Sequence, residues 1–339
     1  AEANAAFSHL CSMMPEAMDR DAPCSDATFT QITGEPLASM NYVRNGKSYD
    51  VFASSLGSEA PAARKRFHER LQTLFRFAIE TSSAIDGSDE RWRVLTIYER
   101  DAPGEHRLVG ACTLFLFQRW LAGSGPVKLL RICQVTTLPP FRKQGHGAKM
   151  LQAVYEYAKS VDALEVTVED PNETFRLVRD KVDLQNGRKY IESHPHKEEP
   201  SALITERKAL KLTEEQMARV SEMRTLQTLR ASGKTNADDS EMKSFRLLVK
   251  KRLSKKHKEE LDAMLSLQKR QKEQEDAEGG GGGESSNAAA AANDGPPTPS
   301  KEELVAMKKE RLEELWQELL AEYEVALKGQ GNFFIAAPK

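Results

Sequence analysis

A short glycine loop between a β-type stretch and an amphipathic pattern constrains this sequence most. Residues 129–138 are rich in aliphatic and β-branched side chains, which are typical of a strand, and they end at Pro139-Pro140. The loop Arg142–Gly147 (RKQGHG) follows. Beyond it, apolar residues recur at helical spacing over residues 150–158. The sequence therefore predicts a strand, a tight loop and a helix in direct succession.

This loop has the chemistry of an anion site. It would lie at the N-terminus of the helix, where free backbone N–H groups and the helix dipole favour a pyrophosphate. Gly145 and Gly147 let the backbone approach the phosphates, and Arg142 and Lys143 add cationic charge. A plain strand-to-helix turn remains the alternative. ATP and NAD sites are disfavoured, because the Gly-Lys-Ser/Thr of a P-loop and the third glycine of a dinucleotide fingerprint are missing.

The surrounding residues predict an α/β fold with a mixed sheet. A strand is expected around residues 49–53, and apolar residues at helical spacing predict a helix over residues 61 to about 83. Residues 93–99 and 108–117 are rich in β-branched and aromatic side chains and favour an antiparallel hairpin. Residues 164–169 predict a further strand. This order of elements is typical of an α/β layer.

Length and local composition predict more than one domain. A chain of 339 residues exceeds the size at which single cores stop growing. Beyond Asp183 the chain consists of long, charged, helix-favouring stretches at residues 210–229 and 240–274. We expect an N-terminal segment at 1–60, an α/β core at 61–183, a helical domain at 184–276, a flexible Gly/Ala/Pro linker at 277–299, and a C-terminal amphipathic helix and tail at 300–339.

Composition disfavours several classes of protein. No apolar run approaches the roughly 18 residues of a membrane span, and we expect no secretory signal at the start of the sequence. The 4 cysteines lack C-x-x-C spacing, which argues against zinc and disulfides, so we expect no metal. The net charge of -2 gives no overall attraction to nucleic acid, and we expect no direct nucleic-acid binding. The basic run at residues 250–258 suits a nuclear localisation signal, a nucleic-acid patch or a solvated helix face.

Several motifs resemble a known family. Arg142-x-x-Gly145-x-Gly147 resembles the Q/R-x-x-G-x-G/A signature of the GNAT acetyltransferase superfamily. A longer series of motifs occurs in the order and spacing of type B histone acetyltransferase catalytic subunits. The series consists of Phe67–Gln72, Glu80-Thr81, Asp89–Trp92, Pro140–Ala148 and Glu169–Pro171. The resemblance covers about residues 48–183 strongly and continues more weakly through the helical region. It implies that the N-terminal segment belongs to a substrate-contacting domain, which family members carry in fuller form.

The resemblance implies a GNAT acetyltransferase fold with a mixed central sheet, followed by an all-helical C-terminal domain. It implies a histone lysine N-acetyltransferase that moves acetyl from acetyl-CoA to the N-terminal tail of newly synthesised histone H4, by direct attack in a ternary complex. The implied partners are the histone H4 tail and a WD40-repeat histone-binding chaperone, in the nucleus and cytoplasm. Two alternatives stay open: a GNAT enzyme for another basic protein or a polyamine, and a non-catalytic histone-binding scaffold.

Acetyl transfer to lysine needs a base, because a free lysine amine with a pKa of about 10.4 is almost fully protonated at neutral pH. Glu169 ends a strand beside the expected cofactor cleft, where partial burial would raise its pKa toward the working range. Asp170 has a second explanation as a helix N-cap, because Pro171 and Glu173 follow at the first and third helical positions. Glu80 suits a solvated helix carboxylate, but the resemblance places it near the acceptor lysine. We expect Glu169 to be the principal base, with Glu80 and Asp170 assisting.

The resemblance also implies contacts to cofactor and substrate. The strand around Val135 would splay from its neighbour and offer backbone hydrogen bonds to the pantetheine arm. The expected cofactor-binding residues are Val135, Thr136, Thr137, Arg142, Lys143, Gln144, Gly145, His146, Gly147 and Thr174. The expected substrate-binding residues are Trp92, Phe115, Leu116 and Phe117, and the acidic residues Asp86, Asp89 and Glu90 would favour a basic tail. Trp92 suits a core aromatic equally well, and Cys133 is interpreted as a small buried hydrophobe.

Overall fold

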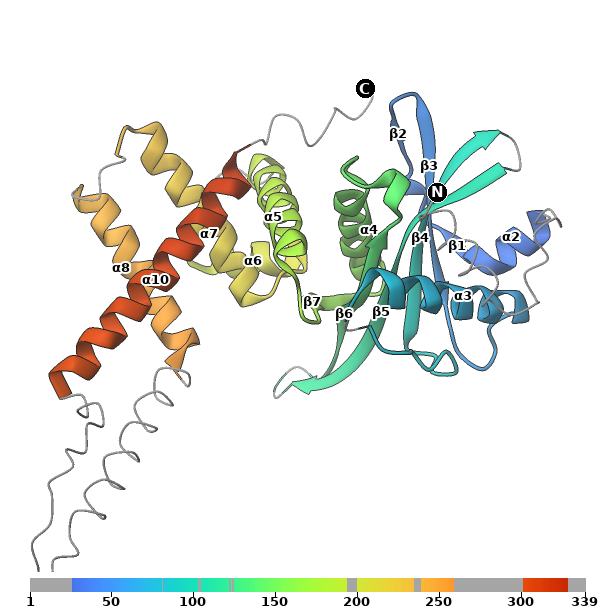
Figure 1. Ribbon diagram of the computed structural model, residues 1–339, viewed down its shortest axis with the longest axis horizontal. Helices are drawn as coiled ribbons and strands as arrows, with labels where there is room; N and C mark the ends of the chain where they lie inside the picture. The colour runs from blue at the N-terminus through green and yellow to red at the C-terminus, as the bar shows by residue number, and fades with distance from the viewer. Residues whose placement is uncertain are drawn as a thin grey trace, which may run out of the picture. The chain divides into compact units, whose positions relative to one another are not determined.

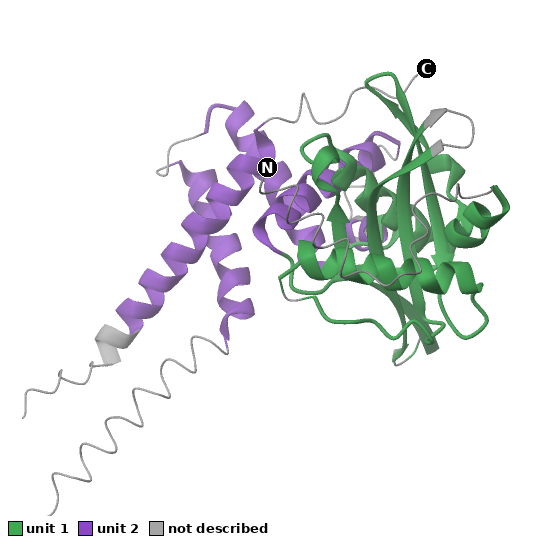
Figure 2. Ribbon diagram, turned by 45° about the vertical axis from the view of Figure 1, so that its right-hand side comes forward, with its two compact units in different colours: residues 1–171, 208–213 green, residues 172–207, 214–339 purple. Residues whose placement is uncertain are grey.

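The chain is organised in two compact units, which Figure 2 colours separately. The computed structural model describes residues 26–80, 82–102, 105–121, 123, 125–193, 200–234, 239–258 and 301–328. Unit 1 comprises residues 1–171 and 208–213, and unit 2 comprises residues 172–207 and 214–339. The boundary falls inside the expected core segment 61–183, since α5 (Glu173–Ser193) belongs to unit 2. The linker expected at 277–299 lies outside the described residues.

A seven-stranded mixed sheet forms the centre of unit 1 (Figure 1). Its strands are β1 (Glu35–Pro36), β2 (Tyr42–Arg44), β3 (Lys47–Ser55), β4 (Trp92–Ala102), β5 (Glu105–Leu121), β6 (Gly125–Thr137) and β7 (Ala163–Val168). They lie in the order β1-β3-β4-β5-β6-β7, with β2 paired to β3. The pairs from β1 to β6 are antiparallel, and β6 and β7 are parallel. The mixed sheet and the β4–β5 hairpin predicted from the sequence are confirmed.

Helix α3 (Ala62–Ala78) covers one face of this sheet. Its buried apolar side chains pack in one cluster with Val94 of β4. The sequence pattern predicted a helix to about residue 83, and this end was wrong. The helix ends at Ala78, and the backbone of the next residue, Ile79, is extended, with φ -130° and ψ 112°. The Ile79 side chain packs against the same apolar cluster, so the chain gains burial by leaving the helix there.

Helix α4 (His146–Ser160) covers the opposite face. Its Tyr157 hydroxyl accepts a hydrogen bond from Arg93 Nε at 3.0 Å. Since Arg93 directly precedes Val94 and successive strand residues point to opposite faces, α3 and α4 enclose the sheet. The inner side of α4 is almost completely buried, with Met150, Leu151, Ala153, Val154, Tyr155 and Ala158 at 2% exposure or less. The amphipathic helix predicted after the glycine loop is thereby confirmed.

Unit 2 is helical in its described part. Its helices are α5, α6 (Pro200–Leu210, of which the first eight residues belong to this unit), α7 (Glu214–Ala231), α8 (Ser240–Lys256) and α10 (Lys301–Leu327). The helix expected at 210–229 starts later, at Glu214, because Lys211 has a left-handed backbone with φ 60°. The Lys211 carbonyl instead accepts a hydrogen bond from the Val166 amide of β7, at 2.8 Å.

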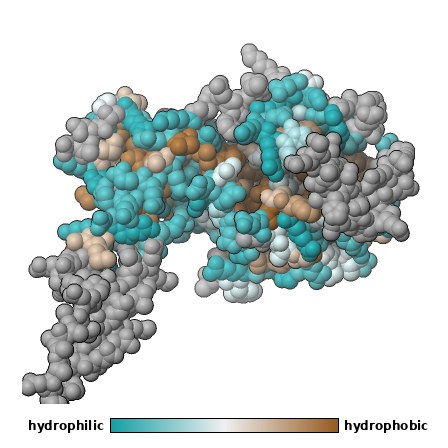
Figure 3. Space-filling model, viewed as in Figure 1, coloured by the Kyte–Doolittle hydropathy of each residue, from teal (hydrophilic) through white to brown (hydrophobic). Residues whose placement is uncertain are grey.

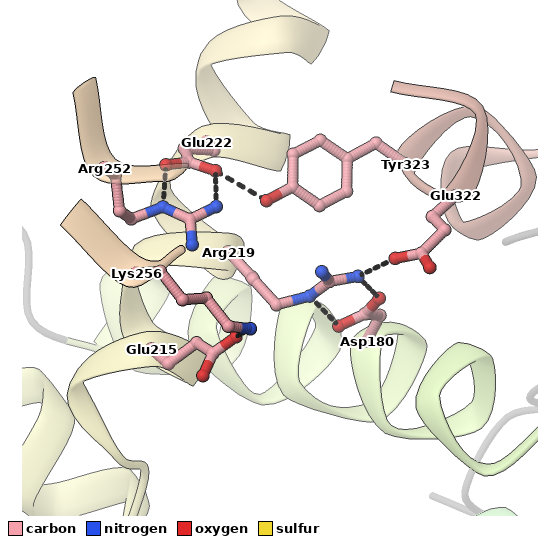
Figure 4. Close-up of polar contacts among 8 residues, drawn as sticks. All are labelled: Asp180, Glu215, Arg219, Glu222, Arg252, Lys256, Glu322 and Tyr323. Carbon is pink, nitrogen blue, oxygen red and sulfur yellow. Dashed lines mark hydrogen bonds and ion pairs between the residues drawn. The ribbon is translucent and has the colours of Figure 1, made fainter. Parts of the chain in front are cut away.

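Buried charges join the helices of unit 2 (Figure 4). Arg219 of α7 makes a two-pronged contact with Asp180 of α5, at 2.9 and 2.5 Å, and reaches Glu322 of α10 at 2.8 Å. Glu222 of α7 accepts hydrogen bonds from Arg252 of α8 and from the hydroxyl of Tyr323 of α10, at 2.7 and 2.6 Å. These contacts fix the mutual arrangement of four helices, because removing one member of a buried ion pair leaves the other charge without a counter-charge.

The basic run at residues 250–258 takes part in this packing. Lys250 pairs with Glu313 of α10, Arg252 with Glu222, and Lys256 with Glu215. Because these cationic side chains are paired with carboxylates of the same chain, the interpretation of the run as a nucleic-acid patch is weakened. The described surface seen in Figure 3 is largely hydrophilic, with apolar residues in smaller patches. Among the described helices, none combines the length and the apolarity that a membrane span requires.

Candidate active site

Strands β6 and β7 stop pairing at one point in the sheet. Their pairing ends at Ile132 and Val168, and the Glu169 amide still donates to the Ile132 carbonyl at 2.9 Å. β6 continues to Thr137, and in the described sheet residues 134–137 are paired with β5 alone. One edge of this stretch therefore offers backbone N–H and C=O groups to an extended ligand. The splayed strand expected around Val135, Thr136 and Thr137 is present.

A β-bulge marks the same point. Thr113 of β5 pairs with Gln134, but Leu114 pairs with Ile132, so Cys133 is the extra residue on β6. The bulge places Cys133 beside Glu169, and the Cys133 thiol donates a weak hydrogen bond to the Arg131 carbonyl at 3.8 Å. Burial, followed by the nearby charge of Glu169, raises the pKa of this thiol to about 12. Cys133 is therefore a protonated neighbour of Glu169, and it is only partly buried, unlike the buried hydrophobe expected from the sequence.

The two strand-end carboxylates differ from expectation. Glu169 is exposed, so the partial burial expected for the principal base is wrong. Asp170 is also exposed and has a left-handed backbone, with φ 38°. It is not the N-cap of α5: the Asn172 side chain takes that role and accepts from the Phe175 amide at 2.8 Å. The left-handed turn at Asp170 moves the helix start two residues further along the chain.

A buried glutamine ties the chain segment after α3 to β6. Gln134 is 6% exposed, and its Nε2 donates to Ser82 Oγ at 2.7 Å and to the Ser83 carbonyl at 3.0 Å. Its Oε1 accepts from Thr113 Oγ1 at 3.2 Å. Exposed Glu80 lies two residues before this anchored segment. Gln134 was not among the expected site residues, although a lone amide in an apolar strand is a signal that could have identified it.

The glycine loop joins β6 to α4 as the sequence predicts. Gly145 immediately precedes the first helical residue and has φ 82°, a left-handed conformation that a glycine adopts without strain. Glycine has no side chain with which to cap the first amides of α4, which therefore stay available to a ligand. Arg142 Nε donates to the Thr137 carbonyl at 3.0 Å, and Gln144 Nε2 to the Pro140 carbonyl at 2.9 Å. These side-chain bonds stiffen the loop.

His146 and Lys143 of the loop face different surroundings. Lys143 is exposed and has a left-handed backbone, with φ 58°. His146 is 1% exposed, and its Nδ1 lies 2.6 Å from the Tyr42 hydroxyl. Burial, followed by the nearby charge of Arg44, lowers the pKa of His146 to about 4, so the ring is neutral at physiological pH. The His146 side chain packs beneath the loop against Tyr42, whereas its backbone forms part of the loop.

Aromatic side chains line the α3 face of β4 and β5. Trp92 pairs with Phe115 across the strands, and the two rings meet edge to face at 4.7 Å. Phe117 lies on the same face, 4.6 Å from Phe115. Arg91 and Arg131 stack over Phe115 and Phe117 at 4.7 and 4.6 Å. The expected substrate residues Trp92, Phe115 and Phe117 are therefore brought together, whereas Leu116 points to the opposite face.

Two of the acidic residues expected near the cleft, Asp86 and Asp89, accept hydrogen bonds from neighbouring side chains. Asp86 accepts two hydrogen bonds from Ser88, which lower the pKa of its carboxyl group. Asp89 binds the Arg91 guanidinium through both oxygens, which lowers the pKa of Asp89. Glu90 is exposed. Thr174 lies in the first turn of α5 and is exposed. Within the described part of the chain, no group of three or more His, Cys, Asp or Glu side chains could hold a metal ion.

Comparison with known proteins agrees with this geometry. Residues 63–175 match the family model described as acetyltransferase (GNAT) family. The chain is 30% identical over 240 residues to the histone acetyltransferase type B catalytic subunit of Mycosarcoma maydis, covering 67% of this chain and 50% of that protein. The subunits of Candida albicans and Schizosaccharomyces pombe are each 30% identical, covering 65% and 68% of this chain and 55% and 58% of their own lengths.

The chain thus spans about half the length of the curated relatives it matches. The resemblance to type B histone acetyltransferase catalytic subunits inferred from the motifs is confirmed, and so is the fold. Residues 63–175 form an acetyltransferase domain of the GNAT family, in a chain that is similar over about two thirds of its length to histone acetyltransferase type B catalytic subunits.

Proposed function

We propose that this protein is an acetyl-CoA-dependent histone lysine acetyltransferase, and that its substrate is the N-terminal tail of newly synthesised histone H4. The observation that carries the proposal is the meeting of three features within unit 1: the parting of β6 and β7, the glycine loop at the start of α4, and Glu169 beside the bulge. The relatives named as type B catalytic subunits support histone as the acceptor.

The chain's own residues fit acetyl-CoA. The uncapped amides behind Gly145 suit a pyrophosphate, because Gly145 carries no side chain that could cap or cover them. The free edge of residues 134–137 suits the amide groups of a pantetheine arm. When bound, the cofactor supplies an activated acetyl thioester. The loop and the strand edge would hold it so that its thioester end lies toward Glu169.

Glu169 is proposed as the base that takes the proton from the acceptor lysine, with Glu80 and Asp170 assisting. A lysine amine must be neutral to attack a thioester, and it is protonated in water. Glu169 is exposed, so a substrate that covers it would desolvate its carboxylate. The neutral amine nitrogen would then attack the acetyl carbon, the carbon–sulfur bond of the thioester would break, and the departing thiolate would take up the proton that the amine loses.

The aromatic patch of Trp92, Phe115 and Phe117 is proposed as the surface for the peptide. Aromatic faces bind the methylene stems and charged ends of lysine and arginine side chains, which abound in histone tails. By the same resemblance, we propose a WD40-repeat histone-binding chaperone as a partner, and the nucleus and cytoplasm as the location.

The function is tested by thiol release from acetyl-CoA with three acceptors: an H4 tail peptide, an unrelated basic peptide of equal charge, and spermidine. The expected result is turnover with the H4 peptide at a kcat/KM at least about tenfold above the others, with acetyl-lysine found by mass spectrometry. Equal turnover of all three would indicate a GNAT enzyme of broader or different specificity. Binding of the H4 peptide without thiol release would instead indicate a histone-binding scaffold.

A further inference from the structure

A hairpin distant in sequence reaches the glycine loop. Strands β2 and β3 are joined by Asn45-Gly46, with φ 50° and 76°, the left-handed pair that a tight two-residue hairpin turn requires. The last residue of β2 is Arg44. Its Nη1 atom lies 2.6 Å from the point where a β-carbon on Gly145 would stand, so the guanidinium rests directly on the loop backbone.

Among the described residues, the guanidinium of Arg44 lacks the counter-charge that its neighbours Lys47 and Arg107 have. Lys47 and Arg107 both bind the buried carboxylate of Glu99, at 2.8 and 2.6 Å. For Arg44 the described part of the chain offers no ion pair, and its Nε is buried without a hydrogen-bond partner. This cation stands at the positive end of α4, where a negative charge would be stabilised and a positive charge is not.

A second buried group at the same place is also unsatisfied. His146 opens α4, is 1% exposed, and within the described residues its Nε2 has no hydrogen-bond partner. Its Nδ1 is occupied by the Tyr42 hydroxyl. Tyr42 in turn stacks on Tyr49 with ring centroids 4.9 Å apart and planes 14° from parallel. The Tyr42–His146 contact ties the hairpin to the start of α4 and so presents Arg44 to the loop.

A phosphate group would satisfy this arrangement. Guanidinium groups donate two parallel hydrogen bonds to phosphate oxygens, and the amides at a helix start donate to the same oxygens. We propose that Arg44 is a phosphate-binding residue that contacts the pyrophosphate of the CoA cosubstrate held by the glycine loop. This inference rests on the proposed function, because it takes acetyl-CoA as the ligand. Arg44 lies outside the glycine signature and reaches the loop from a separate hairpin, so pattern analysis of the loop misses it.

The test is calorimetric binding of three ligands to the full chain: CoA, 3′-dephospho-CoA and acetyl-pantetheine, which has no phosphate. The variants are Arg44→Ala and Arg44→Lys. The matched control is Arg100→Ala, which removes the same charge from β4, where Arg100 is 51% exposed and lies 3.5 Å from Asp50. Far-UV circular dichroism and thermal unfolding report whether each variant folds.

Arg44→Ala is expected to weaken CoA and 3′-dephospho-CoA alike, by about tenfold to a hundredfold, and to leave acetyl-pantetheine unchanged. Arg44→Lys is expected to lose less, since it keeps the charge but not the two-pronged geometry. Arg100→Ala should bind like wild type. The proposal is overturned if Arg44→Ala binds CoA as the control does, if it loses affinity for CoA but not for 3′-dephospho-CoA, or if acetyl-pantetheine weakens equally. If wild type itself binds no CoA, the proposed function fails first.

Discussion

Cys133 and Glu169 are neighbours across the point where β6 and β7 separate. The thiol stands on the bulge, the carboxylate follows the last paired residue of β7, and the charge of the carboxylate helps to raise the pKa of the thiol. This relationship places a carboxylate at the mouth of the open strand edge and gives it a weakly polar, protonated neighbour.

The Cys133 thiol should react slowly with alkylating reagents at neutral pH. Burial and the adjacent Glu169 raise its pKa to about 12, and the thiolate is the reactive form. Alkylation by iodoacetamide, followed at this peptide by mass spectrometry, should keep accelerating up to about pH 12. Glu169→Gln removes the negative neighbour and should shift the profile to lower pH. A rate that levels off near pH 8.5, as for a free cysteine, would contradict this environment.

Gly145→Ala should destabilise unit 1 slightly more than the backbone strain alone, because the new β-carbon must push aside the flexible end of Arg44. A residue with a β-carbon at φ 82° costs roughly 1–2 kcal/mol, and here the β-carbon also meets Arg44 Nη1 at 2.6 Å. Gly46→Ala is the matched control, because it has φ 76° with no atom within 4 Å. Urea unfolding should show the larger loss for Gly145→Ala, with partial recovery when Arg44→Ala is added. Equal losses of unfolding free energy at the two glycines would contradict the placement of Arg44 against the loop.

Gln134→Leu should loosen the segment that follows α3. The change removes the bonds to Ser82 and Ser83 and leaves Thr113 without its partner, which costs about 1–3 kcal/mol. Hydrogen exchange over residues 79–85 should accelerate, and acetyl transfer should fall if Glu80 assists catalysis. The exposed Gln118→Leu on β5 serves as control. Unchanged exchange in Gln134→Leu would mean that other contacts hold the segment.

Unit 2 should lose stability in acid through Glu313. Hydrogen bonds from Lys250, then from Gln317 and Arg246, lower the pKa of this carboxyl from 4.5 to about 2. A depressed carboxyl pKa stabilises the fold above the unfolded-state value, and that contribution disappears as pH falls from about 4.5 to about 2. The free energy of unfolding of unit 2, followed by the Trp316 fluorescence, should decline more steeply in this window than in Glu313→Gln. Parallel pH profiles would contradict the assignment.

Local sequence patterns predicted much of the fold. The strand before the glycine loop, the loop itself and α4 depend on nearest neighbours and on a 3.6-residue period, and each is where the pattern indicated. The end of α3 was misplaced because burial of Ile79 against the sheet outweighs local helix propensity. The cap of α5 was misplaced because the backbone of Asp170 is left-handed, a conformation that an aspartate in the sequence does not predict.

The site itself depends on contacts between distant parts of the chain. The bulge at Cys133 is a mismatch of register between two strands, and no pattern within β6 alone specifies it. The approach of Arg44 to Gly145 joins positions that are far apart in sequence, through the stacking of Tyr42 on Tyr49. The exposure of Glu169 likewise follows from how far β7 extends. Such features require the assembled sheet.

The central claim is that Glu169 acts as the base at the parting of β6 and β7. Its most direct test is the single-turnover rate of acetyl transfer to an H4 tail peptide, with acetyl-CoA saturating, for wild type, Glu169→Gln and the surface control Glu156→Gln of α4. We predict a fall of about 100-fold or more for Glu169→Gln, with CoA affinity unchanged and the control at the wild-type rate. A Glu169→Gln rate within about threefold of wild type would contradict the claim and transfer the role to Glu80 or Asp170.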